Sequence, residues 1–199
     1  PGLIFTLATN YNGYGKVEVN VLDSNNCFLV VIDVQGNLAK VVADSELANE
    51  NVRKLVQGSL ELDLPIFLTA QAPDKIGHTT EPIRALLPEN YEYPRISFSI
   101  WADHDLRSAL LKSGKKQAIL CGFESHICLY QSAIDLQANG FEVWMIADAV
   151  SSRVSASKEI ALTELRAEGV HLSSVEMVLF ALLRNAHHPS FKAISKIIR

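Results

Sequence analysis

The sequence predicts one α/β domain of three layers, α/β/α, around a Rossmann-like parallel sheet of five to six strands. Continuous apolar runs such as "CFLVVIDVQ" (27–35) are typical of strands buried on both faces of a sheet. These runs alternate with segments of helical periodicity, and that alternation indicates βαβ units with right-handed crossovers. The 199 residues, 48% of them hydrophobic, suit a single core, and no repeat or linker divides the chain.

The elements follow in order along the chain. Residues 1–26 are rich in Asn, Gly and Ser and predict an irregular lead-in, so the domain spans 27–199. Strands are expected over 27–33, 64–70, 117–121, 142–148 and 170–172, and 92–100 predicts a short third strand that leads into a loop. Helices are expected over 44–61, 105–112, 125–139, 155–168, 173–184 and 190–198. Three prolines prevent 71–92 from being regular throughout. The helix over 44–61 has Asp44 or Ser45 as N-cap and is expected to bury Leu47, Val52, Leu55, Val56 and Leu60.

Composition and charge indicate which kinds of partner and which compartment to expect. A net charge of -4 and a pI near 5.9 argue against nucleic acid. No apolar run approaches the ~18–20 residues of a membrane span, so no membrane partner is expected. The three cysteines are an odd number without framework spacing, and no secretory signal is recognisable. These features predict a reduced, cytoplasmic protein.

Two side chains are predicted to meet at one edge of the sheet. With strand order 3-2-1-4-5, ligands bind where the order reverses, beyond strands one and four. Asp33 ends the first strand. Ser125 is a plausible N-cap that places Cys128 in the first helical turn, where the helix dipole would lower the thiol pKa. Asp33 would then act as the base that a thiol nucleophile needs. The alternatives are a buried structural cysteine and an aspartate that only caps a loop.

His126 lies two residues before Cys128, so on a helix the two side chains point to different faces. We therefore expect His126 to be a first-turn residue and not the base.

Four segments carry a resemblance to a known family: "CFLVVIDVQ", "RISFSIW", "GFESHICLYQSAIDL" and "IADAVSSR". In this order they resemble the isochorismatase-like cysteine hydrolase superfamily, from residue 27 to the C-terminus. "GFESHIC" fits the nucleophile motif G-[IVF]-E-[TSA]-H-x-C, and the ending "HPSFKAISKIIR" is most similar to the isochorismatase-domain-containing branch. The resemblance implies the isochorismatase-like hydrolase fold and a triad of aspartate, lysine and cysteine.

By this resemblance Asp33 is the general base and Cys128 the nucleophile. It also implies a cis peptide bond that joins Phe123 and Glu124. The backbone N–H groups of Glu124 and Cys128 would then form the oxyanion hole. Isochorismatase proper lacks the cysteine, so the resemblance favours hydrolysis of a small amide or related carbonyl compound through a thioester.

One position departs from the family pattern: the lysine is replaced by Arg95. Arginine retains the cation but is planar, bulkier and effectively never deprotonated. Arg95 either stabilises charge in the site or lies on a surface loop. The departure motivates an alternative function, a catalytically impaired binding or interaction module of the same fold.

The remaining expectations concern the surroundings of the triad. Phe98 and Trp101 either wall the substrate pocket or belong to the core. Asp148, Ser151, Ser152 and Arg153 match the family's strand-five motif and are expected to hydrogen bond across the loop and cap the next helix, over 155–168.

No metal or cofactor is predicted. The segment "TAQAPDKIGHTTEP" offers Gln71 and a single histidine, His78, where metal-dependent relatives carry an aspartate and histidines. A homo-oligomer is expected from the resemblance and from apolar side chains in the last two helices: Leu179, Phe180, Leu182, Leu183, Ile194, Ile197 and Ile198. The alternative is that these side chains only cover the monomer core.

Overall fold

The computed structural model describes residues 21–89 and 91–199. They contain a six-stranded sheet of order β3-β2-β1-β4-β5-β6 in which every neighbouring pair is parallel. The strands are β1 (Cys27–Ile32), β2 (Ile66–Gln71), β3 (Glu92–Arg95), β4 (Gln117–Phe123), β5 (Glu142–Ser151) and β6 (His171–Ser173). The predicted strand order is confirmed, and it reverses between β1 and β4.

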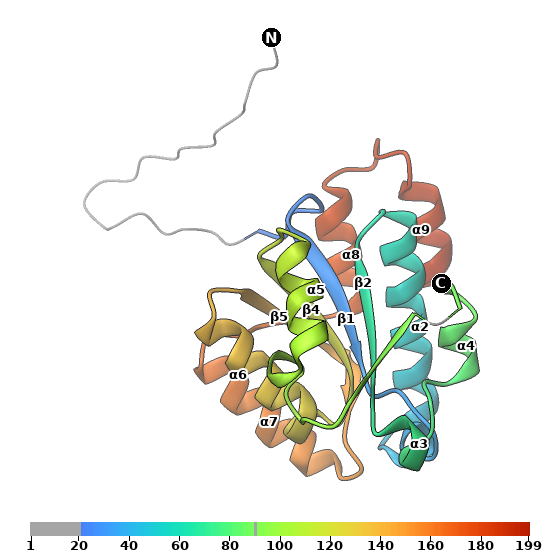
Figure 1. Ribbon diagram of the computed structural model, residues 1–199. Helices are drawn as coiled ribbons and strands as arrows, with labels where there is room; N and C mark the ends of the chain where they lie inside the picture. Colours follow the sequence, from blue (N-terminus) through green and yellow to red (C-terminus); the bar gives the residue numbers. More distant parts are fainter. Residues whose placement is uncertain (1–20, 90) are drawn as a thin grey trace.

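Helices cover both faces of the sheet (Figure 1). One face carries α2 (Ser45–Glu61), α8 (Val175–Leu183) and α9 (Phe191–Ile198). The other carries α5 (His104–Lys112), α6 (Tyr130–Ala138) and α7 (Ser155–Ala167). Short elements fill the connections: α1 (Leu38–Val41), α3 (Pro73–Ile76), α4 (Glu81–Arg84), the 3₁₀ turn η1 (Ile100–Ala102) and the π-helical turn η2 (Ser125–Leu129). The three-layer prediction is confirmed.

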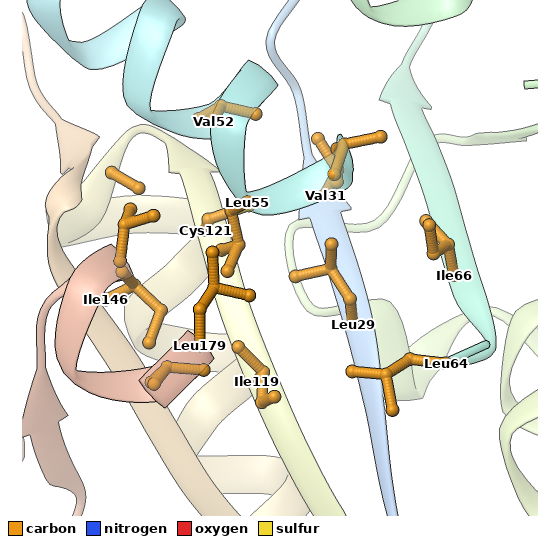
Figure 2. Packing of buried hydrophobic residues seen from close by; sticks show 14 of the residues in the cluster. Leu29, Val31, Val52, Leu55, Leu64, Ile66, Ile119, Cys121, Ile146 and Leu179 are labelled. Atoms are coloured by element: carbon orange, nitrogen blue, oxygen red, sulfur yellow. The ribbon is translucent and has the colours of Figure 1, made fainter. Parts of the chain in front are cut away.

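The central strands are buried on both faces, as their apolar runs predicted. In β1, Leu29 and Val31 pack toward α2 and α8, whereas Phe28 and Val30 pack toward α5 and α6. Figure 2 shows the first of these two cores, where Leu55 of α2 and Leu179 of α8 meet the sheet. The two cores fix β1 and β4 firmly, and the site lies where these strands end.

Helix α2 buries Val52, Leu55 and Val56 as predicted, but not the two outer leucines of the predicted stripe. Leu47 is 62% exposed and Leu60 is 41% exposed, so both were wrongly placed inside. The buried stripe runs through Ala48, Val52, Leu55, Val56 and Ser59. Small residues at both ends of this stripe keep α2 close to its neighbours, and the larger leucines are turned outward. Asp44 precedes the helix without a side-chain capping bond.

The last two helices cover the monomer core. Leu179, Leu182, Leu183 and Ile194 are buried, and Phe180 meets Phe191 edge to face at 6.2 Å between ring centroids. The surplus apolar surface predicted on these helices is therefore small, and it does not by itself support an oligomer.

The first 20 residues of the predicted lead-in lie outside the described residues, whereas 21–26 contain only a turn. No helix within the described ranges is long and apolar enough to cross a membrane.

Candidate active site

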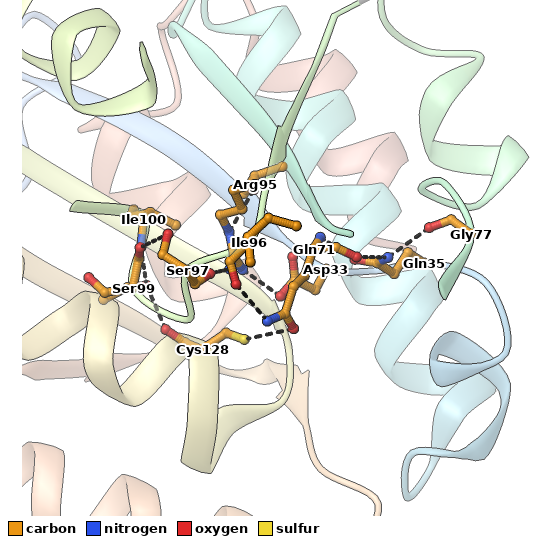
Figure 3. A network of polar contacts seen from close by, with 12 residues as sticks. Asp33, Gln35, Gln71, Gly77, Arg95, Ile96, Ser97, Ser99, Ile100 and Cys128 are labelled. Carbon is orange, nitrogen blue, oxygen red and sulfur yellow. Dashed lines mark hydrogen bonds and ion pairs between the residues drawn. The ribbon is translucent and has the colours of Figure 1, made fainter. Parts of the chain in front are cut away.

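The carboxyl ends of four strands bring the site together at one edge of the sheet (Figure 3). Asp33 follows β1, Gln71 ends β2, Arg95 ends β3, and Cys128 lies in η2 directly after β4. The Asp33 N–H donates to the Thr69 carbonyl oxygen at 3.0 Å, and its φ of 54° turns the chain out of the strand. Asp33, Arg95 and Cys128, which are up to 95 residues apart in sequence, therefore share one crevice as predicted.

Gly122 allows β4 to approach β1 just before the site. Its φ is +117°, and an added Cβ would lie 1.9 Å from the Ile32 carbonyl oxygen. Only glycine fits this close approach. The glycine that opens the nucleophile motif thus brings η2 close to the residue that precedes Asp33.

Arg95 is buried, so the surface-loop interpretation was wrong. Its side chain is 0% exposed, and Nη2 lies 2.5 Å from Asp33 Oδ2. Nε donates to Thr69 Oγ1 at 2.9 Å, and Nη1 donates to the Ser97 carbonyl oxygen. The planar guanidinium is thus held on three sides, and its charge faces Asp33.

Asp33 carries one engaged and one free carboxylate oxygen. Oδ2 binds Arg95, whereas Oδ1 is buried without a hydrogen-bond partner among the described residues. Burial raises the pKa of Asp33, and the charge of Arg95 opposes this rise, as do weaker interactions with the Cys128 thiol and the Gln71 backbone. An unpaired buried carboxylate oxygen with a raised pKa is suited to receive a proton.

Cys128 is a buried thiol and not the thiolate predicted from the helix start. Burial and, next, the negative charge of Asp33 raise the pKa of Cys128 to about 12, although Arg95 acts in the opposite direction. The thiol donates to Gln71 Oε1 at 3.9 Å. The predicted lowering of the pKa was wrong because loss of solvent outweighs any effect of a helix terminus at this depth.

The start of the nucleophile helix also differs from the prediction. Ser125 lies inside η2 and does not cap it: its Oγ donates to the Ser151 carbonyl oxygen at 3.0 Å. His126 Nδ1 lies 2.9 Å from Ser152 Oγ, so His126 bonds to the loop after β5, in agreement with the expectation that it does not serve Cys128.

The cis peptide bond expected between Phe123 and Glu124 is present. The Glu124 side chain is 8% exposed, and its Oε1 accepts bonds from the N–H and the Nε of Arg153, at 3.1 and 3.0 Å. These bonds hold the start of η2. The oxyanion hole of the Glu124 and Cys128 N–H groups stays a prediction.

The strand-five motif bonds across the loop as expected, but the expected cap of the next helix was wrong, because α7 begins after Val154 without a side-chain capping bond. Asp148 Oδ1 accepts from the Val175 N–H at 2.9 Å and so caps α8. Ser151 Oγ donates to the Ala43 carbonyl oxygen at 2.6 Å, and Ser152 Oγ accepts from the Ser125 N–H at 3.1 Å. These bonds tie the end of β5 and the residue after it to the α1–α2 connection and to η2.

The two predicted pocket aromatics have different environments. Trp101 is partly buried and packs against Phe141 at 5.6 Å between ring centroids, at the margin of the second core, and its contact with substrate stays a prediction. Phe141 immediately precedes β5, at the amino end of that strand. Phe98 is 50% exposed in the segment after β3, and its contact with substrate stays a prediction.

Three polar residues of the site were missed from the sequence. Gln35 is fully buried and bonds both backbone groups of Gln71, Gln71 contacts the thiol, and Thr69 accepts from Arg95. Position in the predicted sheet was the available signal. Gln35 follows the strand that leads to Asp33, and Thr69 and Gln71 lie near the carboxyl end of the neighbouring strand β2.

Away from the triad, a cavity of about 700 Å³ lies between α4 and β3, and its lining includes His78, Arg84 and Glu92. His78 pairs with Glu92 at 2.6 Å. None of the triad residues lines this cavity. Within the described ranges no group of three or more His, Cys, Asp or Glu residues is arranged to hold a metal ion.

Fold and site define a three-layer α/β protein with a buried aspartate–arginine–cysteine cluster at the point where strand order reverses. The isochorismatase domain model matches residues 27–177, so the chain belongs to the isochorismatase family. Membership supports a hydrolase-type function.

Known proteins agree with this assignment. Isochorismatase domain-containing protein 2 of Danio rerio is 34% identical over 180 residues, which cover 89% of each chain. The MAR1 ribonuclease structure from Caenorhabditis elegans has a TM-score of 0.84 and 28% identity, covering 90% of this chain and 92% of that one. YcaC from Pseudomonas aeruginosa, with hexane-2,5-diol and covalent acrylamide, has a TM-score of 0.86 at 23% identity, covering 92% and 93%, and shows the fold alone.

Proposed function

We propose that the protein is a metal-independent cysteine hydrolase that cleaves a small amide or related carbonyl compound through a thioester. One observation carries the proposal: a buried thiol, Cys128, shares a crevice with Asp33, whose Oδ1 is free and whose Oδ2 is held by Arg95. The raised pKa of Cys128 means that the resting thiol keeps its proton, so attack requires a base, and Asp33 supplies one.

The reaction follows from these roles. Asp33 takes the thiol proton as Cys128 Sγ attacks the carbonyl carbon, and the oxyanion accepts from the Glu124 and Cys128 N–H groups. The tetrahedral adduct then expels the amine, which takes the proton from Asp33 and leaves a thioester. Asp33 next takes a proton from water, whose oxygen attacks the thioester; the carboxylic acid is released, and the departing Cys128 sulfur takes the proton back from Asp33. Arg95 stabilises negative charge throughout, and since arginine does not deprotonate, Asp33 alone moves protons.

A screen of small amides against wild type, Cys128→Ala and Asp33→Asn tests the proposal. Wild type should release amine and accumulate a thioester adduct visible by intact mass after acid quench, and both variants should be inactive. Turnover that survives in Cys128→Ala would exclude Cys128 as the nucleophile.

Asp33→Asn also separates catalysis from thiol reactivity. Asp33 raises the pKa of Cys128, so its replacement should lower that pKa and speed alkylation at a given pH. A hydrolase should therefore gain a more reactive thiol and lose turnover in the same variant. A non-catalytic binding module would gain the reactive thiol but show no amide turnover in wild type.

We expect a small-molecule substrate and not nucleic acid. The net charge of -4 supports this, and Arg95, the cation of the site, is already engaged by Asp33. Because the C. elegans neighbour is a ribonuclease, RNA belongs in the screen, and Cys128-dependent RNA cleavage would overturn this expectation.

We also place the protein in the cytoplasm. All three cysteines are free thiols, which supports a reducing compartment. Fractionation of cells that express the full-length protein tests this placement.

A further inference from the structure

Gln71 presents a fixed amide to the nucleophile. Its Nε2 donates to the Ile96 carbonyl oxygen at 3.2 Å, and because a carbonyl oxygen only accepts, the nitrogen must face Ile96. The Gln71 Oε1 therefore faces Cys128, whose Sγ lies 3.9 Å away (Figure 3). The orientation of this side-chain amide is thus set by a neighbouring backbone group.

The backbone of Gln71 is held independently of its side chain. Its N–H donates to Gln35 Oε1 at 2.7 Å, and its carbonyl oxygen accepts from Gln35 Nε2 at 2.9 Å. Gln35 Nε2 also donates to the Gly77 carbonyl oxygen at 2.7 Å. The position of Gln71 therefore does not depend on what its side chain binds, and the side chain is left for another task.

The hydrogen-bonding capacity of the Gln71 side chain is only partly used. Oε1 has two lone pairs and receives one long bond from a thiol, which is a weak donor. Gln71 is also only half-buried, whereas Cys128 is 4% exposed, so a small molecule that reaches the sulfur passes beside Gln71. An N–H group placed there would find a free acceptor.

We propose that Gln71 Oε1 accepts a hydrogen bond from the N–H of the scissile amide and so selects N–H amides over esters and N,N-dialkyl amides. The proposal rests on the proposed hydrolase function and narrows its substrate class. Gln71 belongs to β2, whereas the proposed oxyanion donors are Glu124, just before η2, and Cys128, within it, so different elements would bind the nitrogen and the carbonyl oxygen of the substrate. Gln71 is a specificity-determining residue in this scheme, and the chemistry stays with Cys128 and Asp33.

Paired alkylating reagents test the proposal without any turnover. Iodoacetamide has N–H groups, and 2-iodo-N,N-dimethylacetamide has none. With either reagent the sulfur forms a bond to the methylene carbon, iodide leaves with the C–I electrons, and the thiol proton passes to Asp33 or buffer. Rates are measured at Cys128 by peptide mass spectrometry, because Cys27 and Cys121 are also free thiols, and are divided by the rates of a small free thiol.

After this division wild type should prefer iodoacetamide by about three- to tenfold, the range that one neutral hydrogen bond supplies. Gln71→Met should bring the ratio close to one, and Gln71→Glu, which retains an acceptor, should keep a preference. Gln137→Met is the matched control, since the Gln137 side chain lies at the far end of α6, where its Nε2 donates to the Glu168 carbonyl oxygen at 3.4 Å, and it should behave like wild type. A merely structural disturbance would slow both reagents alike and leave the ratio unchanged.

Three results would overturn the proposal: a wild-type ratio of one, a Gln71→Met ratio equal to that of wild type, or a Cys128 that neither reagent reaches. The outcome is separable from the hydrolase proposal. A preference for iodoacetamide in a protein that hydrolyses no amide refutes the hydrolase alone, whereas amide hydrolysis without the preference refutes only the role of Gln71.

Discussion

Replacing Arg95 by methionine should destabilise the protein strongly at neutral pH. The change removes the cation beside Asp33 and leaves a carboxylate that is 2% exposed without its partner. Breaking a buried pair from one side typically costs about 3–5 kcal/mol. In a chain of this length 1 kcal/mol corresponds to about 2–4 °C in Tm, so we expect Tm to fall by roughly 6–20 °C.

The stability lost in Arg95→Met should be larger at neutral pH than in acid. Burial already raises the pKa of Asp33, and Arg95 opposes the rise, so the pKa rises further in Arg95→Met. A carboxyl whose pKa is higher in the folded than in the unfolded chain binds its proton more tightly when folded, so its ionisation costs stability as pH increases. The gap between variant and wild type should be full at neutral pH and should narrow as acid protonates Asp33.

Thermal unfolding followed by circular dichroism at pH 5 and pH 7.5 measures both effects. Arg53→Met is the matched control, because Arg53 pairs with Glu50 on the surface. Its loss should lower the free energy of unfolding by about 0–1 kcal/mol. Asp33→Asn combined with Arg95→Met should recover part of the loss and its pH dependence. An Arg95→Met protein that melts like Arg53→Met at both pH values, or a gap that does not narrow in acid, would refute the reasoning.

Two further predictions concern packing and assembly. Gly122→Ala should lose more than about 1 kcal/mol in urea unfolding, because its Cβ would lie 1.9 Å from the Ile32 carbonyl oxygen, whereas Gly114→Ala, at φ +69° with nothing within 4 Å, should lose less. Equal losses would mean that φ alone matters. The homo-oligomer expected from the family resemblance should scatter light as a species heavier than the 21.9 kDa chain at micromolar concentration, and a monomer alone would contradict it.

The sheet could be predicted because burial on both faces leaves a plain signal. Strands such as β1 are continuously apolar, and the residues that follow them mark the carboxyl edge where Asp33 and Cys128 meet. Arg95 was placed by resemblance and not by periodicity, since an arginine after a short strand that contains a proline has no signal of burial. Its guanidinium is buried because Thr69, Ser97 and Asp33 satisfy it.

Other features depend on how deeply a side chain is buried and on which way it points, and neither can be read from the sequence. The start of a helix predicted a lowered thiol pKa, but the burial of Cys128 reverses the direction. Gln35 and Gln71 are ordinary glutamines in sequence, and their importance comes from facing each other across neighbouring strands. Trp101 was expected near substrate because it follows the third strand, and the packing of its ring against Phe141 at the margin of the second core had no signal in the sequence.

The Asp33–Arg95 pair joins two strands whose backbone amides should differ in their protection from hydrogen exchange. β1 lies between β2 and β4 and is buried throughout, whereas β3 is a four-residue edge strand that, among residues 21–89 and 91–199, pairs only with β2. Backbone amides at such an edge exchange with solvent through local openings that need much less free energy than global unfolding. Each opening of β3 carries the guanidinium away from a carboxylate that stays in place on β1. We therefore expect the charge balance of the site to be lost whenever β3 opens while the rest of the sheet stays folded, and deuterium uptake in β3 would measure how often this happens.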